Sequence, residues 1–305
     1  MTSVLVVSFR YGQDADANRD RVTAIVGSVG GQAREGGPVD LVVFPEYASR
    51  YYPRGVGPEH AEPLDGPFVT GLRAAARAAG VAVIAGTTIP GDRPDRAVNA
   101  VVMVDREGAL GVYRKVHLYD AFGQRESDRL EAGPADGPPP VIVVGGLRVG
   151  VMTCYDLRFP ESARRLVDAG ADVLAVPAAW VAGEHKADHW LTLLRARAIE
   201  NTAYVLGAAL DGPGLTGESI VVDPYGVVVA GAGAGGAGPD AGALAGEGDR
   251  WVTAVLDASV VAQARERNPS LYNRRYVVVP AERQGGRAPA SPPRTWRGSP
   301  PRSGR

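Results

Sequence analysis

Short runs of apolar, mostly β-branched residues alternate along the chain with segments in which apolar residues recur every three or four positions. The short runs are typical of buried strands, and the periodic segments are typical of helices with one apolar face. Strands are predicted over Val4–Phe9, Leu41–Phe44, Val81–Thr87, Val98–Asp105, Gly111–Tyr113, Val141–Val144, Arg148–Thr153, Val173–Val176, Tyr204–Ala209, Ser219–Val222, Val227–Val229 and Trp251–Leu256. Helices are predicted over Ala15–Val29, Phe68–Ala79, Glu161–Ala169, Lys186–Asn201 and Ser259–Arg267.

Three turns between neighbouring strand runs predict β-hairpins. They are Arg106-Glu107-Gly108, Gly145-Gly146 and Asp223-Pro224-Tyr225-Gly226. Because hairpins are mixed with strand–helix units, the order predicts a layered α/β protein in which helices cover the sheets. No internal repeat and no linker divides residues 1–283, so we expect one domain there.

Two segments differ in composition from the rest of the chain. Residues 231–248 are almost all Gly and Ala, and residues 284–305 are mainly Gly, Pro, Ser and Arg without an acidic residue. Neither segment has enough apolar surface to offset the entropy lost on ordering it. We expect the first to be a long loop within the domain and the second to be a disordered Pro/Arg-rich tail.

Charge and cysteine content narrow the classes of function. With 33 basic and 34 acidic residues, the net charge of -1 gives no general attraction for nucleic acid or for an anionic membrane. The single cysteine, Cys154, excludes an intrachain disulfide and a cysteine-based metal site. The N-terminus has no basic leader, and the chain has no apolar run of about 18 residues. We therefore expect a cytoplasmic protein with no nucleic-acid or membrane partner.

Three reactive side chains, Glu46, Lys115 and Cys154, come directly after apolar runs. Cys154 occupies the place of a nucleophile elbow between a strand and a helix, where backbone N–H groups can lower the pKa of a thiol and form an oxyanion hole. A thiol, a carboxylate and an ammonium group would together supply the nucleophile, the proton shuttle and the oxyanion stabiliser of acyl transfer. Each residue alone also has an ordinary interpretation, as a small buried hydrophobe, a strand-end charge and a solvated lysine.

Sequence blocks around these residues carry a family resemblance. The main blocks are Phe44-Pro45-Glu46, Tyr113-Arg114-Lys115-Val116-His117-Leu118 and Cys154-Tyr155-Asp156-Leu157-Arg158-Phe159-Pro160-Glu161. Further blocks are Pro177-Ala178-Ala179-Trp180, Arg195-Ala196-Arg197-Ala198-Ile199-Glu200-Asn201, Gly217-Glu218-Ser219 and Asp223-Pro224-Tyr225-Gly226. In this order, and over about residues 3–280, the chain resembles the nitrilase or carbon–nitrogen hydrolase superfamily.

The resemblance implies a fold and an assembly. The fold is an α-β-β-α sandwich, which pairs with a second copy into an αββα–αββα homodimer or a higher even oligomer. Arg195, Arg197 and Glu200 could form a solvated face with local ion pairs or could lie at the dimer interface, and the resemblance favours the interface.

The resemblance also implies roles for the reactive side chains. Cys154 would attack the substrate carbon, Glu46 would take and return its proton, and Lys115 would hold the oxyanion together with the backbone N–H of Tyr155. An accessory carboxylate is implied in the loop after the lysine. Glu126 is the candidate, with Glu131 as its rival because the length of this loop varies.

The sequence motif around Cys154 is similar to that of the ω-amidase and deaminated-glutathione-amidase branches of the superfamily. It implies a thiol-dependent hydrolase that cleaves the non-peptide C–N bond of a small linear amide through a thioester, releasing ammonia or an amine. Tyr155, Trp180 and Arg158 are the candidate substrate-binding residues, although Trp180 fits a plain core position equally well. Those branches use substrates with a free carboxylate, for which Arg158 and Arg50 are possible anchors. A nitrilase, an N-carbamoyl amidohydrolase, an amide-forming acyl transferase and a non-catalytic scaffold remain alternatives.

Two other motifs are weak. Residues 231–236 match G-x-G-x-x-G after a strand, but no amphipathic helix follows that could bind a pyrophosphate group. His185 and His189 would share one helix face, but no third metal ligand is evident. We therefore expect neither a cofactor nor a metal ion.

Overall fold

Strands and helices alternate through residues 1–30, 38–231, 241–243 and 248–281, the parts of the chain that the computed structural model describes. The strands are β1 (Thr2–Arg10), β2 (Leu41–Val43), β3 (Ala82–Pro90), β4 (Ala97–Val104), β5 (Leu110–Arg114), β6 (Val141–Val144), β7 (Leu147–Val151), β8 (Val173–Ala178), β9 (Tyr204–Asp211), β10 (Ile220–Val222), β11 (Val228–Gly231), β12 (Ala241–Ala243) and β13 (Arg250–Leu256). The α-helices are α1 (Ala15–Val29), α2 (Pro67–Ala79), α3 (Pro160–Asp168), α4 (Lys186–Asn201), α5 (Ala258–Arg267) and α6 (Ser270–Asn273). Short 3₁₀ helices are η1 (Pro58–His60), η2 (Glu126–Asp128) and η3 (Cys154–Arg158).

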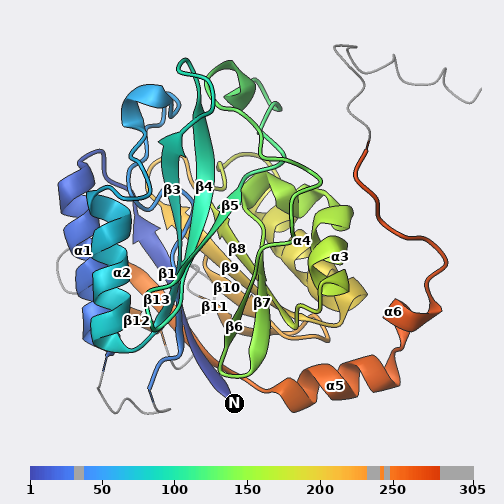
Figure 1. The fold of residues 1–305 in the computed structure, drawn as a ribbon. Helices are drawn as coiled ribbons and strands as arrows, with labels where there is room; N and C mark the ends of the chain where they lie inside the picture. The colour runs from blue at the N-terminus through green and yellow to red at the C-terminus, as the bar shows by residue number, and fades with distance from the viewer. Residues whose placement is uncertain (31–37, 232–240, 244–247, 282–305) are drawn as a thin grey trace, which may run out of the picture.

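Alternate residues of the strands point into different hydrophobic cores. In β1, Leu5 and Val7 pack in a core with α1 and α2, whereas Val4 and Val6 belong to a second core shared with β7, β8 and β9. A third core joins the outer side of β8 and β9 to α3 and α4. The layers are therefore α-β-β-α, with α1 and α2 on one side and α3 and α4 on the other (Figure 1). The α/β sandwich predicted from the sequence is confirmed.

The direction of the strands determines which loops lie at the same edge of the sandwich. Hydrogen bonds connect the strands in the order β5-β4-β3-β2-β1-β9-β8-β7-β6. Pairing is parallel for β1–β2, β2–β3, β1–β9, β8–β9 and β7–β8, and β5 runs the same way as β3 because both are antiparallel to β4. The carboxyl ends of β2, β5, β7 and β8 therefore meet at one edge of the fold. The loops that follow them carry Glu46, Lys115, Cys154 and Trp180, and this edge is where α/β sheets bind ligands.

Every strand and helix predicted from the hydrophobic pattern is present, with ends that differ by at most a few residues. The helices Ala15–Val29 and Lys186–Asn201 have the predicted bounds. The short helix α6 and the 3₁₀ helices were not predicted, since segments this short carry no period. In the part of the chain that the structure describes, no helix is both long and apolar enough to span a bilayer.

One expectation about the Gly/Ala-rich segment is wrong in part. Within residues 231–248, expected as a loop, Ala241–Ala243 forms β12 and pairs antiparallel with β13. Backbone pairing along an available strand edge needs no apolar side chain, so composition alone did not reveal it. Residues 232–240 and 244–247, and the tail 284–305 for which we expected disorder, lie outside the described residues.

Candidate active site

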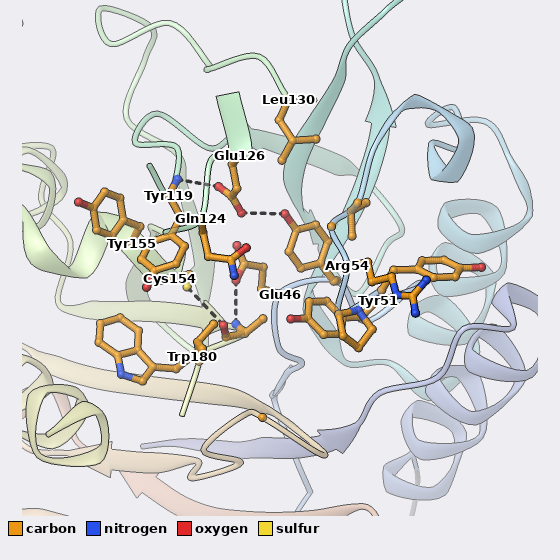
Figure 2. A pocket seen from close by; sticks show the side chains of 18 of the residues that line it. Glu46, Tyr51, Arg54, Tyr119, Gln124, Glu126, Leu130, Cys154, Tyr155 and Trp180 are labelled. Carbon is orange, nitrogen blue, oxygen red and sulfur yellow. Dashed lines mark hydrogen bonds between the residues drawn. The ribbon is translucent and has the colours of Figure 1, made fainter. Parts of the chain in front are cut away.

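Cys154 lies at a sharp turn between β7 and η3. Its φ is 46°, in the left-handed region that residues other than glycine rarely adopt, so the turn holds a strained backbone. The hydroxyl of Thr153 donates to the carbonyl oxygen of Pro177 at 2.7 Å and ties the turn to β8. Cys154 is 8% exposed, and its Sγ lies 3.9 Å from the carbonyl oxygen of Ala179 (Figure 2).

Glu46 follows β2 and is almost completely buried. Its Oε1 accepts hydrogen bonds from Asn99 Nδ2 at 2.6 Å and from Lys115 Nζ at 2.9 Å. Its Oε2 accepts from the backbone N–H of Ala179 at 2.7 Å. An unpaired carboxylate in this position would be costly, and these donors stabilise its charge and fix its orientation.

The backbone around Glu46 approaches β3 very closely. The N–H of Gly86 in β3 donates to the carbonyl oxygen of Pro45 at 3.0 Å, and a Cβ on residue 86 would clash with the backbone of Glu46. A glycine in the middle of a buried strand thus permits this approach. Tyr47, the residue after Glu46, has a φ of 57°, and its hydroxyl donates a hydrogen bond to Glu126 at 3.1 Å.

Lys115 bridges two carboxylates. Its Nζ lies 2.9 Å from Glu46 Oε1 and 2.9 Å from Glu126 Oε2, and the side chain is 1% exposed. Burial disfavours the ammonium ion, but the charges of Glu126 and Glu46 outweigh burial and hold the pKa of Lys115 well above its ordinary value. Lys115 is therefore cationic at neutral pH. An ammonium group has three N–H donors, so one donor to each carboxylate leaves the third for another acceptor.

The loop after β5 carries the two glutamates between which the sequence did not decide. Glu126 contacts Lys115 and also accepts a hydrogen bond from the backbone N–H of Tyr119 at 2.8 Å (Figure 2). Glu131 instead forms an ion pair with Arg114 at 2.6 Å. The geometry brings Glu126, and not Glu131, to Lys115.

The thiol of Cys154 has an environment that differs from the expectation. Burial and then the charge of Glu46 raise the pKa of Cys154 well above its ordinary value, and the charge of Lys115 lowers it only in part. The low thiol pKa that a nucleophile elbow can give is therefore not found here, because the sulfur is buried beside carboxylates. A neutral thiol needs a base to take its proton as it attacks, and Glu46 is the carboxylate that acts most strongly on it.

Cys154, Glu46 and Glu126 line a pocket of about 570 Å³. Figure 2 shows the sulfur between two groups of side chains, with Tyr155 and Trp180 on one side and Tyr51 and Arg54 on the other. The pocket therefore extends in both directions from the sulfur. The cationic side chains that line it are Arg54, Arg125, Arg129, Arg158 and Lys186.

Comparison with known proteins identifies the family. The model of the carbon–nitrogen hydrolase family matches residues 9–277. The chain belongs to the carbon–nitrogen hydrolase family. Deaminated glutathione amidase from Escherichia coli O157:H7 is 37% identical to this hydrolase over 255 residues, which are 83% of this chain and 91% of that protein.

Solved structures of family members have the same fold as this hydrolase. A CN-hydrolase superfamily protein from Xanthomonas campestris, with an arsenic adduct in its active site, matches with a TM-score of 0.74 at 28% identity, covering 91% of this chain and 99% of that one. A branch 10 member of the nitrilase superfamily from Saccharomyces cerevisiae matches with a TM-score of 0.72 at 26% identity, covering 90% of this chain and 97% of that one. The resemblance noted in the sequence is thereby confirmed, and the protein is a carbon–nitrogen hydrolase enzyme.

The hydrolase places its three candidate substrate-binding residues at the pocket. Tyr155, Trp180 and Arg158 all line it, and the guanidinium carbon of Arg158 lies 4.9 Å from the centre of the Trp180 ring. Trp180 is also buried and donates its Nε1–H to the carbonyl oxygen of Lys186 at 2.8 Å, so it is both core and pocket wall. Arg50 is not among the described residues that line the pocket.

Lys186, the first residue of α4, is a pocket cation that the sequence analysis missed. It is 8% exposed, donates to the hydroxyl of Tyr119 at 2.9 Å and lies 3.6 Å from the centre of the Phe122 ring. Burial, and then the charge of Arg158, lower the pKa of Lys186. Within the described residues no carboxylate pairs with it. A lysine at the start of a predicted helix resembles a surface residue, which is why its position gave no signal.

Helix α4 also corrects one of the two expectations for Arg197, because its side chain does not lie on a solvated face. Arg197 is buried, and its Nε and Nη2 donate to the carbonyl oxygen of Leu157 at 3.1 and 2.7 Å, which holds the end of η3. Its position could have been found, because Trp190, Leu194 and Arg197 recur with the helical period on one buried face. Glu200 pairs with the remaining Nη1 of Arg197 at 2.9 Å within the same helix.

Two further motifs from the sequence are the pair His185 and His189 and the G-x-G-x-x-G match. The ring centres of His185 and His189 lie 6.3 Å apart, and no group of three or more His, Cys, Asp or Glu side chains in the described residues could hold a metal ion. Most of the G-x-G-x-x-G match, residues 232–236, lies outside the described residues.

Proposed function

We propose that this hydrolase is an amidase that forms a thioester on Cys154 and releases ammonia or a small amine. The observation that carries the proposal is the contact of Lys115 with both Glu46 and Glu126, two carboxylates that line the same pocket as Cys154. A nucleophile, a proton acceptor and a fixed cation are the groups that acyl transfer requires.

The first half-reaction forms the thioester. As Cys154 Sγ attacks the amide carbon, its proton passes to Glu46 and the carbonyl electrons move to the oxygen. The third N–H of Lys115 and the backbone N–H of Tyr155 stabilise the oxyanion. Tyr155 lies in the first turn of η3, where backbone N–H groups have no acceptor within the helix. Protonated Glu46 then gives the proton to the nitrogen, the C–N bond breaks, and ammonia or the amine leaves.

The second half-reaction releases the acid. Glu46, again a carboxylate, takes a proton from a water molecule that attacks the thioester carbon. The C–S bond then breaks, and the proton returns to the sulfur of Cys154, which regenerates the thiol. Because Lys115 lies between Glu46 and Glu126, the cation stays in place while Glu46 gains and loses charge. Glu126 is thus the accessory carboxylate of this proposal.

The substrate that we propose is a small linear amide with a free carboxylate. The support is a pocket cation without a carboxylate partner in the described residues, Lys186, next to the guanidinium group of Arg158. Deaminated glutathione amidases are among the similar proteins. Arg158 lies over the Trp180 ring, and Lys186 contacts Tyr119, whose ring packs on Tyr155. A carboxylate between Lys186 and Arg158 would therefore place the amide on the side of the pocket that Trp180 and Tyr155 line, next to Cys154.

The test is a substrate panel with trapping of the intermediate. The wild-type enzyme is expected to release ammonia from ω-amides of dicarboxylic acids and to lose activity on the matching neutral amides. Mass spectrometry of quenched enzyme should show an acyl adduct on Cys154, and Cys154→Ala should remove adduct and turnover without unfolding the protein. Turnover only of nitriles or N-carbamoyl compounds, or transfer of the acyl group to an added amine, would replace the amidase by one of these activities. Retained turnover in Cys154→Ala would overturn the mechanism.

We also propose that the enzyme is a homodimer. Ile199, Tyr225 and Val227 are exposed apolar residues, and the side chain of Ile199, near the end of α4, lies against Gly226 of the β10–β11 turn, which separates the other two. Beyond α6 the chain runs away from the sandwich (Figure 1), with exposed Tyr276 and Val277. Contiguous exposed apolar surface of this kind is typical of an interface. Analytical ultracentrifugation should show a dimer, and Ile199→Asp should shift the protein to the monomer.

The limits and location of the enzyme complete the proposal. We take residues 1–283 as the catalytic domain, since the family match ends at residue 277, and removal of residues 284–305 should leave kcat unchanged. We place the enzyme in the cytoplasm because a thiol nucleophile must stay reduced and Cys154 is free. Fractionation of cells that express the protein would test this location.

A further inference from the structure

A buried carboxylate outside the pocket, Asp156, joins two segments of the candidate site. Its side chain is 0% exposed, and both oxygens are occupied. Oδ1 accepts from the backbone N–H of His117 at 3.1 Å and lies 2.7 Å from His117 Nδ1. Oδ2 accepts from the hydroxyl of Tyr113 at 2.7 Å and from the backbone N–H of Thr153 at 2.9 Å. One carboxylate thus holds groups from two distant parts of the chain.

These groups flank both reacting segments. Tyr113 and His117 lie two residues before and two residues after Lys115, and Thr153 directly precedes Cys154. Strand pairing does not make this connection in the described residues, because β5 and β7 lie near opposite ends of the hydrogen-bonded order of strands. The link between the segment of the lysine and the turn of the cysteine therefore depends on side chains.

We infer that Asp156 is a positioning residue that sets the separation between Lys115 and Cys154. It does not line the described pocket, so it acts through the backbone of the two segments and does not touch the substrate. Catalytic groups must keep their productive geometry within a fraction of an ångström, and a displacement of about 1 Å can lower the rate roughly 100-fold. The inference rests on the proposed function, since it assigns a purpose to the spacing of the same site.

A second buried aspartate provides a matched control. Asp249 is also 0% exposed, forms an ion pair with Arg21 and accepts a hydrogen bond from the backbone N–H of Arg10 at 2.8 Å. It does not line the described pocket either. Asp249→Asn should therefore lower stability, as the loss of any paired buried aspartate does, without changing the spacing of Lys115 and Cys154.

The test compares Asp156→Asn with Asp249→Asn. For Asp156→Asn we expect kcat to fall by roughly 10- to 100-fold, with KM within about threefold of the wild type, because the pocket lining is unchanged. Cys154 of this variant should also react more slowly with iodoacetamide at pH 9. A displaced Lys115 would no longer offset the charges of Glu46 and Glu126, which disfavour the thiolate form of Cys154. Asp249→Asn should change Tm alone. Equal kcat and equal alkylation rates in the two variants would overturn the inference.

Tyr113→Phe decides the question if Asp156→Asn does not fold. It removes one donor and keeps the ring, so the protein should fold, with kcat lowered several-fold at unchanged KM. A folded Tyr113→Phe with wild-type kcat and alkylation rate would also overturn the inference. The alkylation rate can be measured without a substrate. If the wild-type enzyme turns over no compound of the panel, the proposed amidase function is overturned, but the role of Asp156 can still be tested by the alkylation rate of Cys154.

Discussion

Lys115 Nζ lies 2.9 Å from Glu46 Oε1, and each of these side chains is 1% exposed. A fully buried ion pair is poor evidence for stability, because the desolvation of both ions can exceed their attraction. Here additional partners reduce that cost, namely Asn99 and the N–H of Ala179 for the carboxylate and Glu126 for the ammonium ion. Glu46 lines the same pocket as Cys154, and the charges of both Glu46 and Lys115 act on the thiol. This position of the pair is better explained by chemistry than by folding.

The first prediction separates the two glutamates of the loop after β5. Glu126→Gln removes one of the two charges that hold Lys115, so we expect kcat to fall by roughly 10- to 100-fold. Glu131→Gln removes a carboxylate that pairs with Arg114 instead, and kcat should stay within about threefold of the wild type. Steady-state ammonia release from the best amide of the panel measures both. A larger loss in Glu131→Gln would reverse the assignment.

The second prediction concerns the pKa of the Cys154 thiol, on which Glu46 and Lys115 have opposite effects. The charge of Glu46 raises the pKa of Cys154, and the charge of Lys115 lowers it. Glu46→Gln should therefore lower this pKa and speed alkylation by iodoacetamide, whereas Lys115→Met should raise it further and slow alkylation. Both variants should lose turnover, by about 100-fold or more. The pH dependence of the alkylation rate gives the two shifts, and shifts of the same sign would contradict this account.

Much of the fold was predictable from the chain because its signals are local. The helix Lys186–Asn201 has its apolar residues at helical spacing, and its predicted and observed bounds agree. Glu46, Lys115 and Cys154 were found because each follows an apolar run, and the family's motifs surround them. Strand direction then brings these strand ends to one edge of the sandwich.

The remaining site residues depend on contacts between segments that are distant in sequence. Asn99 stands near the start of a predicted strand, and only the fold shows that its amide reaches Glu46. Glu126, the first residue of η2, and Glu131 both lie in the long connection between β5 and β6, in which no periodicity tells which carboxylate turns inward. The raised pKa of Cys154 depends on burial beside Glu46, which strand-end position alone does not reveal.

The third prediction concerns the close approach at Gly86. A methyl group at this position would clash with the backbone of Glu46, so Gly86→Ala must displace the segment that carries the proton shuttle. We expect a loss of about 1–3 kcal/mol in the free energy of unfolding, and a fall in kcat larger than the change in KM. Gly27→Ala is the control, because this glycine of α1 has open space around it and alanine favours a helix. Denaturation and kinetics on both variants test the claim, and unchanged kcat in a folded Gly86→Ala would contradict it.

The fourth prediction tests the anchor for the substrate carboxylate. Lys186→Met keeps the length of the side chain but removes its charge, so kcat/KM for a carboxylate-bearing amide should fall by roughly 10- to 100-fold, mainly through KM. For a neutral amide of the same length the ratio should change little. Arg106→Met removes an exposed cation outside the described pocket and should alter neither substrate. Equal losses on the charged and the neutral amide would show that Lys186 supports the pocket structurally and does not bind the carboxylate.

The fifth prediction concerns stability in alkali. Burial raises the pKa of Tyr51 above its ordinary value of 10.0, with a smaller contribution from the charge of Glu46, and Lys115 also has a raised pKa. In the unfolded chain these groups lose their protons near their ordinary values, whereas the folded protein keeps them, so the folded state binds more protons above pH 10. The free energy of unfolding must therefore fall as pH rises through this range. Tyr51→Phe removes one such group and should lessen the fall between pH 10 and 11 by about 1 kcal/mol. Tyr272→Phe, at a side chain that is 88% exposed, should not. Urea denaturation at pH 8, 10 and 11 measures the slopes, and equal slopes for Tyr51→Phe and the wild type would contradict the argument.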